Sequence, residues 1–459
     1  MTVNVTSRNL TLELGEFVAG LRYRNIPDRA LHTIRSGFVD TIGVLIGGSK
    51  DAAVTLLART LDPKSGNSES LVHGDLISAP EAAWINGTAA HTLDYDDGAN
   101  RSHPSAVLVS AILAEAQAIN ATGPDMASAY LAGYEVLAEL AHRDVDQPVK
   151  KGWHPTGVFG AIAAAAAVAN LHRLDRQQST HALALAASQS SGIVSNFGSM
   201  TKPLHVGRAA HAGVMSARLA AAGFTGSVDA IEHPQGFLSA ISPQGRVDRS
   251  TPLRAGSDWH ILRNGLNVKK YPMCFCAHRC IDAVLELREE HSIDASRIRR
   301  ITTSISRRNA TILRNSFPQT ALEAKFSIQF AMASAMLAGR VSLVEFNDDF
   351  VQREDVRNLM KLVEVEALDE ELPGSGHAPF DWVTIETADG KVIRSRKINH
   401  AAGAFEDPLD ASELKNKFVA CLKSVHAPFN ADSMFAAIHA FDSVTCARQL
   451  YSSHFEEEI

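Results

Sequence analysis

Residues 188–226 read SQSSGIVSNFGSMTKPLHVGRAAHAGVMSARLAAAGFTG, a stretch that joins a Ser/Gly-rich loop to a helix. The part up to Thr201 is small and polar, a composition suited to turns and close backbone approach. A cationic group that includes Lys202 and Arg208 follows, and an Ala-rich helix is predicted over residues 209–222. Cations at the start of a helix favour anion binding, because the helix N-terminus adds its own partial positive charge. The alternative is a solvated basic helix start with ordinary surface histidines.

The length and charge of the chain limit its class. With 459 residues it is too long for one typical hydrophobic core, so two domains are expected. A formal net charge of −7 without a long basic block argues against nucleic acid as a partner. No apolar run reaches the roughly 20 residues that a membrane span needs, and the N-terminus lacks a signal-peptide pattern. We therefore expect a cytoplasmic protein with no membrane partner.

Most of the chain has the pattern of buried helices. Ala-rich helical segments are predicted over residues 104–121, 125–142, 155–171 and 176–188. Small side chains let such helices pack closely, so this part is expected to be a helical bundle with little sheet. The tail, 410–455, is helical again and is expected to pack on the same bundle.

The pattern changes near residue 265. A helix is predicted over 278–291, and strand character follows at 297–306, 363–368 and 381–398, the last with a hairpin turn at Asp389-Gly390. The predicted fold class is therefore mainly α, with an inserted α/β domain. The expected boundaries are 1–264 plus 399–459 for the all-helical domain and 265–398 for the α/β domain.

Five cysteines, an odd number, favour reduced thiols over a disulfide framework. Cys274, Cys276 and Cys280 have the spacing C-x-C-x3-C, which matches neither a zinc ribbon nor a ferredoxin run. Their apolar neighbours favour packed thiols. No metal site is predicted.

The segment His91–Ser105, HTLDYDDGANRSHPS, is the first candidate site. Asp94, Asp96 and Asp97 crowd three carboxylates into four residues, and His103 follows. An EF-hand calcium loop is excluded by the missing Gly and Glu. The alternative is a helix C-terminus that runs into an Asp-rich turn.

Two further segments carry candidate residues. In KGWHPTGVFG, His154 precedes a predicted helix whose first amides could bind an anion, although it could instead stack on Trp153. In KKYPMCFCAHRCID, Lys269, Tyr271 and His278 are candidates, although the lysine pair has the pattern of a solvated one. No nucleotide-binding or hydrolase motif is present. The remaining set of histidines, aspartates and cations suits acid–base chemistry on an anionic substrate without a cofactor.

Together these segments resemble the MmgE/PrpD family, which includes 2-methylcitrate dehydratase, cis-aconitate decarboxylase and iminodisuccinate epimerase. The matching pieces run in family order and include HTLDYDDG, GWHPTGVFG, TKPLHVGRAA, HPQGFLSAI and KKYPMCFCAHRCIDA. The resemblance implies a large all-helical domain, a smaller α/β lid domain, a homodimer and a cofactor-free site between the domains. The site residues that it implies are Asp94, His103, His154, Lys202 and His278.

The chemistry shared by the family is removal of a proton α to a carboxylate of a dicarboxylate or tricarboxylate. We expect His103 and His154 to be the base and the acid, and Asp94 to orient one of them. Lys202 is expected to hold substrate carboxylates, or to act as a base if burial lowers its pKa. The other expected substrate-binding residues are Arg208, Tyr271 and Lys269.

Two departures from the family pattern decide the expected reaction. Gly98 and Phe330 stand where the dehydratase and decarboxylase members have Thr and Tyr, so two hydroxyls are missing. A leaving group or product carbanion then lacks a proton donor. The sequence therefore favours an epimerase of a succinate-type dicarboxylate such as iminodisuccinate. The alternatives are a hydro-lyase of the 2-methylcitrate dehydratase type and a decarboxylase of the cis-aconitate type.

Overall fold

The computed structural model describes residues 9–70, 74–370, 372 and 378–450, and it divides into two compact units. Unit 1 consists of residues 1–267 and 411–459, and unit 2 of residues 268–410. The sequence-based boundaries lay at 264/265 and 398/399. The expected helical tail is described as far as residue 450, and its last residues lie outside the described part. That unit 2 serves as a lid stays a prediction.

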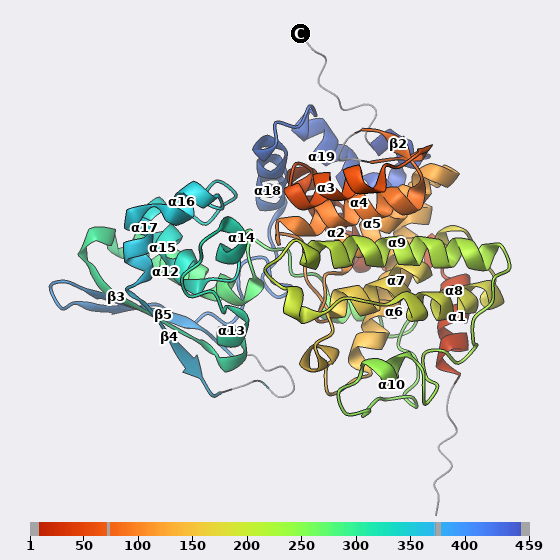
Figure 1. Cartoon of the computed structure of the whole chain (residues 1–459), viewed down its shortest axis with the longest axis horizontal. Coiled ribbons are helices and arrows are strands. Elements are labelled where there is room, and N and C mark those ends of the chain that lie inside the picture. The colour runs from red at the N-terminus through yellow and green to blue at the C-terminus, as the bar shows by residue number, and fades with distance from the viewer. Residues whose placement is uncertain (1–8, 71–73, 371, 373–377, 451–459) are drawn as a thin grey trace, which may run out of the picture. The chain divides into compact units, whose positions relative to one another are not determined.

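Unit 1 is helical apart from one short antiparallel pair of strands (Figure 1). Its helices are α1 (Leu10–Gly20), α2 (Asp28–Gly48), α3 (Ala52–Leu61), α4 (Ala79–Thr92), α5 (Pro104–Ile119), α6 (Gly123–His142), α7 (Pro155–Leu171), α8 (Arg176–Gln189), α9 (Thr201–Ala221), α10 (Phe237–Ile241), α11 (His260–Asn264), α18 (Ala411–Ser424) and α19 (Ala431–His439). The strands are β1 (Ser65–Glu69) and β2 (Leu76–Ile77).

Helix α7 is the centre of unit 1, and every one of its residues is buried. It packs against α5, α6, α8 and α9. Alanine and glycine make this possible: a Cβ added at Gly213 of α9 would lie 2.2 Å from the Cβ of Ala164 in α7. The bundle predicted from the Ala-rich segments is confirmed, since small residues allow close helix packing.

Helices α4 and α9 cross in direct backbone contact. A Cβ on Gly87 would lie 2.8 Å from Gly207 Cα, and a Cβ on Gly207 would lie 2.1 Å from the carbonyl oxygen of Trp84. Only glycine permits this approach. The crossing brings the C-terminal end of α4 beside the N-terminal end of α9.

Helix α9 begins earlier than the sequence suggested. It starts at Thr201 and not at residue 209, so Lys202 and Arg208 lie in the helix and not in a loop before it. The reason is Pro203, which fits the first helical turn because the amides there have no intrahelical acceptor.

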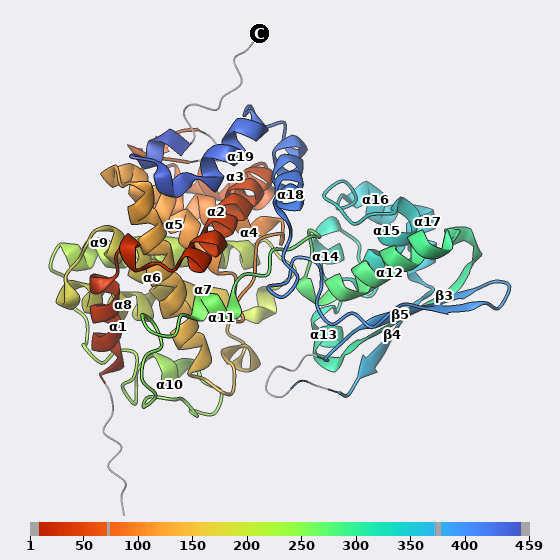
Figure 2. The ribbon, with the colours of Figure 1, turned by 180° about the vertical axis from the view of Figure 1, so that it is seen from behind.

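The C-terminal segment belongs to unit 1 because α18 and α19 pack against α2 (Figure 2). Phe418 of α18 fills the space above Gly43, where a Cβ would lie 2.8 Å from its ring. Among the described helices, no single one is long and apolar enough to cross a membrane; the bent pair α2–α3, with an angle of 82°, meets that test only jointly.

Unit 2 is a small sheet with helices. Its helices are α12 (His278–His291), α13 (Arg307–Ile312), α14 (Ala321–Ala324), α15 (Ile328–Ala338), α16 (Asp348–Gln352) and α17 (Glu354–Met360). The strands β3 (Ile298–Ser306), β4 (Val363–Leu368), β5 (Trp382–Thr387) and β6 (Val392–Arg394) have the order β4-β3-β5-β6. The β3–β4 pair is parallel and the other two are antiparallel. The predicted hairpin turn is confirmed, with Gly390 at a φ of 82°.

Candidate active site

Five helix ends or loops of unit 1 meet at a buried polar cluster. We call this set the histidine–aspartate cluster; its members are His91, Asp94, Asp96, His103, His154, Lys202 and His205. His91 lies in the last turn of α4, His103 and His154 directly precede α5 and α7, and Lys202 lies in the first turn of α9. The sequence predicted four of these residues. Asp96 and His205 lay in candidate segments of the sequence without an assigned role, and His91 was not singled out.

An ion pair joins α9 to the loop after α4. Lys202 Nζ lies 2.6 Å from Asp94 Oδ1, and the two side chains are only 8% and 6% exposed. Asp94 has a φ of 51°, so the loop reverses at this residue and turns its carboxylate toward Lys202. The ammonium also lies 5.4 Å from the ring centroid of Phe197.

A second carboxylate, Asp96, binds two histidines. Its Oδ2 lies 2.8 Å from Nδ1 of His91 and 3.2 Å from Nδ1 of His103. The Nδ1 of His103 also lies 2.8 Å from the carbonyl oxygen of Asp97. Both Nδ1 atoms therefore carry the proton, and both Nε2 atoms are left as lone-pair acceptors. The prediction gave this orienting role to Asp94, but the turn at Asp94 directs Asp96 to the histidines instead.

Burial determines the charges within the cluster. Burial lowers the pKa of His91 to about 3, so His91 is neutral at neutral pH. Burial alone would raise the pKa of Asp96, but His91 and His103 hold it well below its usual range. Asp96 is therefore an ionised acceptor between two imidazoles. His103 differs from His91 because its side chain is 20% exposed and can reach a ligand.

His154 faces the cluster and not Trp153. Its Nδ1 lies 3.1 Å from Nδ1 of His205, and its ring meets Phe197 edge-on with centroids 4.9 Å apart. Burial, together with His91 and Lys202, lowers the pKa of His154 well below its usual range. His154 is therefore a neutral hydrogen-bonding group at this site. The ring contacts of His154 are with His91, Phe197 and His205, so the alternative of a His154 stacked on Trp153 is wrong.

Lys417 of helix α18 contacts the loop that carries Asp94, Asp96 and Asp97. Lys417 Nζ lies 2.5 Å from Asp40 Oδ1 and donates to the carbonyl oxygen of Tyr95 at 2.7 Å. Neighbouring Asp97 is buried, and burial followed by the charge of Asp40 raises its pKa well above its usual range. The pKa values of Asp97 and Asp96 therefore shift in opposite directions, and Asp96 is the carboxylate of this pair that keeps its charge more readily.

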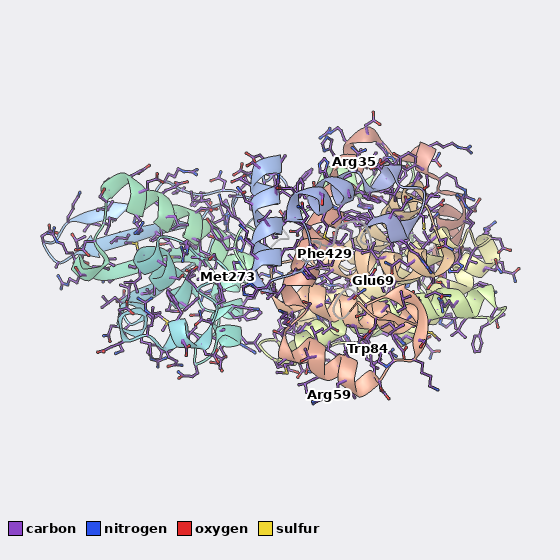
Figure 3. All side chains as sticks on the ribbon, turned by 90° about the horizontal axis from the view of Figure 1, so that it is seen from above. Arg35, Arg59, Glu69, Trp84, Met273 and Phe429 are labelled. Atoms are coloured by element: carbon purple, nitrogen blue, oxygen red, sulfur yellow. The ribbon has the colours of Figure 1, made fainter. Side chains whose placement is uncertain are left out.

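Arg208 does not join the cluster. Its guanidinium carbon lies 5.2 Å from the ring centroid of Trp84, and its Nη1 donates to Nδ1 of His211 at 2.5 Å. Lys202 and Arg208 are six residues apart, which at 100° per residue separates their directions by 120°. The expectation that Arg208 belongs with Lys202 is corrected by this placement. Trp84 is labelled in Figure 3.

The remaining predicted residues belong to unit 2. His278 begins α12 and is buried, with Nε2 3.3 Å from the carbonyl oxygen of Met273 and its ring 5.1 Å from that of Tyr271. The hydroxyl of Tyr271 donates to Asp282 at 2.7 Å. Lys269 is 2% exposed, so the solvated position suggested by its pattern is wrong.

The five cysteines are free thiols. Cys280 is buried, and burial raises the pKa of its thiol well above the usual value. A side-chain hydrogen bond with Cys274, followed by burial, does the same for Cys276. These thiols are therefore protonated at neutral pH.

One group in the described residues has the geometry of a metal site. Ligand atoms of His91, Asp94 and His103 lie within 4.8 Å of one another. The Lys202 ammonium already lies against Asp94, so a divalent cation would have to displace it.

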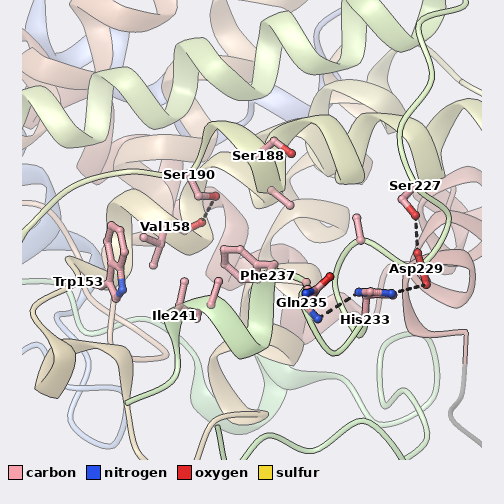
Figure 4. Close-up of a pocket in the computed structure, with 14 residues that line it drawn as sticks. Trp153, Val158, Ser188, Ser190, Ser227, Asp229, His233, Gln235, Phe237 and Ile241 are labelled. Carbon is pink, nitrogen blue, oxygen red and sulfur yellow. Dashed lines mark hydrogen bonds and ion pairs between the residues drawn. The ribbon is translucent and has the colours of Figure 1, made fainter. Parts of the chain in front are cut away.

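Unit 1 also has a cavity of about 430 Å³, which shares no residue with the histidine–aspartate cluster (Figure 4). Trp153, Phe237 and Ile241 give it an apolar wall. Its polar groups pair among themselves: Ser190 donates to the carbonyl oxygen of Val158 at 2.8 Å, and the backbone amide of Gln235 donates to His233 Nδ1 at 3.1 Å. The cavity is therefore poor in free polar groups for acid–base chemistry.

Comparisons with known proteins identify the family of the chain. The model of the MmgE/PrpD N-terminal domain matches residues 12–250, and that of the MmgE/PrpD C-terminal domain matches residues 271–442. A human cis-aconitate decarboxylase is 27% identical over 428 residues, with 90% of this chain and 87% of the human protein covered. The mouse cis-aconitate decarboxylase is 25% identical, with 95% and 91% covered. A protein of the same name from Aspergillus terreus is 21% identical, with 77% of each covered.

Proposed function

The chain belongs to the MmgE/PrpD family of enzymes, and on that premise we propose that it is a lyase that decarboxylates an unsaturated tricarboxylate of the cis-aconitate kind. Relatives named cis-aconitate decarboxylase cover nine-tenths of the chain, which supports this reading over the epimerase favoured by the sequence.

The observation that carries the proposal is the shared carboxylate Asp96. It fixes the tautomer of His103 and would stabilise the imidazolium that His103 becomes on taking up a proton. The exposed edge of His103 then offers an acid from Nε2, while Nδ1–H remains on the protein. A buried carboxylate with this role raises the reactivity of a histidine without taking its proton.

The cation for the substrate is Lys202. Its ammonium is buried against Asp94, so the pair is close to neutral before substrate binds. A substrate carboxylate that approaches Lys202 meets a positioned donor in a site of low dielectric constant, where charge pairing is strong.

The reaction needs one proton and no redox step. The bond between the CH2 carbon and its carboxylate breaks, and CO2 leaves. The electron pair moves through the C=C bond onto the carbon next to another carboxylate. The negative charge spreads onto that carboxylate, and Lys202 stabilises it. His103 then gives its proton to that carbon, and solvent restores the proton on His103 through its exposed edge.

His154 and His278 have supporting parts in the proposal. His154 is neutral and can hydrogen-bond a substrate carboxylate. For His278 the support is the family pattern alone, and we propose that it takes part in proton transfer. A His278→Gln variant that keeps wild-type kcat and KM would contradict this part.

An isomerase remains the second candidate because of Gly98 and Phe330. A Cβ on Gly98 would meet only the carbonyl oxygen of Ser102 at 3.6 Å, so nothing nearby forbids a hydroxyl-bearing side chain there. Phe330 is fully buried and packs on Phe346 and Phe350 with ring centroids 5.2 and 6.1 Å away. An enzyme that returns the proton to the opposite face of the same carbon needs no further acid.

One NMR experiment in D2O separates these reactions. With cis-aconitate, the proposed lyase releases CO2 and gives a product with one deuterium at the newly protonated carbon. With single-enantiomer succinate-type dicarboxylates, an isomerase gives deuterium in recovered substrate and loss of optical activity. Loss of water from a methylcitrate-type substrate indicates a hydro-lyase. Absence of CO2 release from cis-aconitate, with deuterium exchange in a dicarboxylate, would reject the lyase in favour of the isomerase.

A further inference from the structure

A second group of polar side chains lies across the α4–α9 crossing from the histidine–aspartate cluster. On one side of the Gly87–Gly207 contact, Lys202 meets the loop after α4; on the other side, Arg208 and His211 of α9 meet Trp84 of α4. Six residues of helix separate Lys202 from Arg208, about 9 Å along the axis. We call Trp84, Arg208 and His211 the outer cluster.

The outer cluster presents hydrogen-bond donors. Arg208 can only donate, so its contact with Nδ1 of His211 makes that atom the acceptor and leaves the proton on Nε2. The indole Nε1–H of Trp84 is shielded from solvent and has no hydrogen-bond partner among the described residues. The guanidinium keeps N–H groups beyond the one given to His211. These groups all need an acceptor.

The charge of the outer cluster is uncompensated. Within the described part of the chain, no carboxylate forms a hydrogen bond or ion pair with Arg208. Burial lowers the pKa of Arg208, with no acidic neighbour to oppose it. Burial, followed by the charge of Arg208, lowers the pKa of His211 to about 4, so His211 is neutral. The cluster therefore carries one positive charge in a half-buried position.

From this arrangement we infer that the outer cluster is a carboxylate-binding site, separate from the histidine–aspartate cluster, in which Arg208 binds the carboxylate and His211 and Trp84 position the guanidinium. A single positive charge with the planar N–H donors of a guanidinium matches a monoanionic carboxylate. The guanidinium carbon of Arg208 lies 5.2 Å from the Trp84 ring centroid, and the His211 ring packs on Trp84 tilted by 58°, so Trp84 helps to orient both side chains. The carboxylate comes either from a small organic acid or from an acidic side chain of a second copy of this chain.

The indole signal of Trp84 reports on this site. The chain has four tryptophans, so tryptophan labelled with ¹⁵N gives few indole signals, and the Trp84→Phe variant identifies the one from Trp84. The full-length protein is titrated with sodium acetate, with sodium chloride of equal ionic strength as the reference. The expected result for a free carboxylate is a saturable shift of the Trp84 signal with half-saturation at about 10 mM.

Three variants give the controls. Arg208→Met is expected to weaken the acetate response by at least about tenfold. Arg29→Met removes an exposed arginine of α2 and should leave the response unchanged. Arg208→Lys keeps the charge but loses the planar donors, so a weakened and measurable response supports the site even if Arg208→Met does not fold.

Sedimentation of the same proteins distinguishes the two sources of the carboxylate. If a second copy supplies it, the Trp84 signal of the assembled protein ignores acetate, and Arg208→Met weakens self-association by about tenfold while Arg29→Met does not. If the Trp84 signal ignores acetate and Arg208→Met self-associates as the wild type does, the inference is wrong. An acetate response that survives in both Arg208 variants overturns it as well.

Discussion

The Nδ1 atom of His91 lies 2.8 Å from Oδ2 of Asp96, and both side chains are completely buried. The same oxygen lies 3.2 Å from Nδ1 of His103, which reaches solvent. One carboxylate therefore sets the tautomer of a buried histidine and of a reachable one. The proton chemistry proposed for His103 depends on this shared acceptor.

Replacing Asp96 tests that dependence. Asp96→Asn keeps the shape but removes the charge that stabilises protonated His103, and its amide can favour the wrong tautomer. We expect kcat to fall by about 10²–10⁴-fold, the range in which loss of an orienting aspartate lies. The matched control is Asp97→Asn, because the Asp97 carboxylate accepts from the amide of Ser105 and burial raises its pKa, which favours the neutral form that Asn mimics. A fall of less than tenfold in Asp96→Asn, or equal falls in both variants, would contradict the role of Asp96.

The ion pair between Lys202 and Asp94 can be tested by a double-mutant cycle. Lys202→Met leaves the buried Asp94 carboxylate without its cation, and we expect a loss of about 3 kcal/mol in unfolding free energy. Lys202→Met combined with Asp94→Asn removes both charges and should recover most of that stability. Activity should stay lost in the double variant, because the substrate carboxylate has no cation. Recovery of turnover together with stability would mean that Lys202 serves the fold alone.

The pH dependence of stability follows from His91. Its folded pKa of about 3 lies below the unfolded value of 6.5, so the unfolded chain takes up a proton first as the pH falls. The contribution of His91 is complete above pH 6.5 and is lost progressively toward pH 3. Between pH 7 and pH 5 the loss from this one residue is about 2 kcal/mol. Urea unfolding at both pH values measures it.

His91→Gln is the control for this pH effect. Gln can still donate to Asp96 but does not titrate, so the variant should lose less unfolding free energy than the wild type between pH 7 and pH 5. Equal losses in the two proteins would place the pH effect elsewhere, for example at His142 or His211, whose pKa values burial lowers to about 4.

Much of the fold could be predicted because its helices are rich in small apolar side chains, which give a clear helical pattern. Helix α7 was predicted with its observed ends, since Pro155 begins it and small apolar side chains continue to Leu171. The start of α9 could not be predicted from composition. The Ser/Gly content of the preceding residues indicated a longer loop, and the position of Pro203 in the first turn allowed the helix to begin earlier.

Within the site, residue types could be predicted but not all of the pairs. The sequence placed Asp94, His103, His154 and Lys202 in one site, and the structure brings these four together. The partner of His103 depended on the left-handed turn at Asp94, which side-chain patterns do not reveal. The sequence analysis assigned Arg208 to the same site as Lys202, which is wrong. The two side chains point 120° apart on α9, and the close crossing of α4 and α9 at their glycines brings Arg208 to Trp84. The homodimer stays a prediction.

Restoring a hydroxyl at Gly98 tests directly whether its absence decides between decarboxylation and isomerisation. The Gly98 backbone pairs with Asn267 through hydrogen bonds of 2.9 Å in both directions, and its φ is not in the left-handed region. A threonine is therefore accommodated, and Gly98→Thr should change the unfolding free energy by no more than about 0.5 kcal/mol. The added hydroxyl would lie one residue from Asp97 and could donate to a substrate oxygen or a product carbanion. If loss of CO2 is limited by proton delivery, Gly98→Thr should increase product formation from cis-aconitate, with Gly98→Val as the matched control of equal shape.

An increase in both variants would assign the effect to shape and not to the hydroxyl. A decrease in the Thr variant alone would indicate that this enzyme uses the open space at Gly98 for a different substrate, and would favour the isomerase.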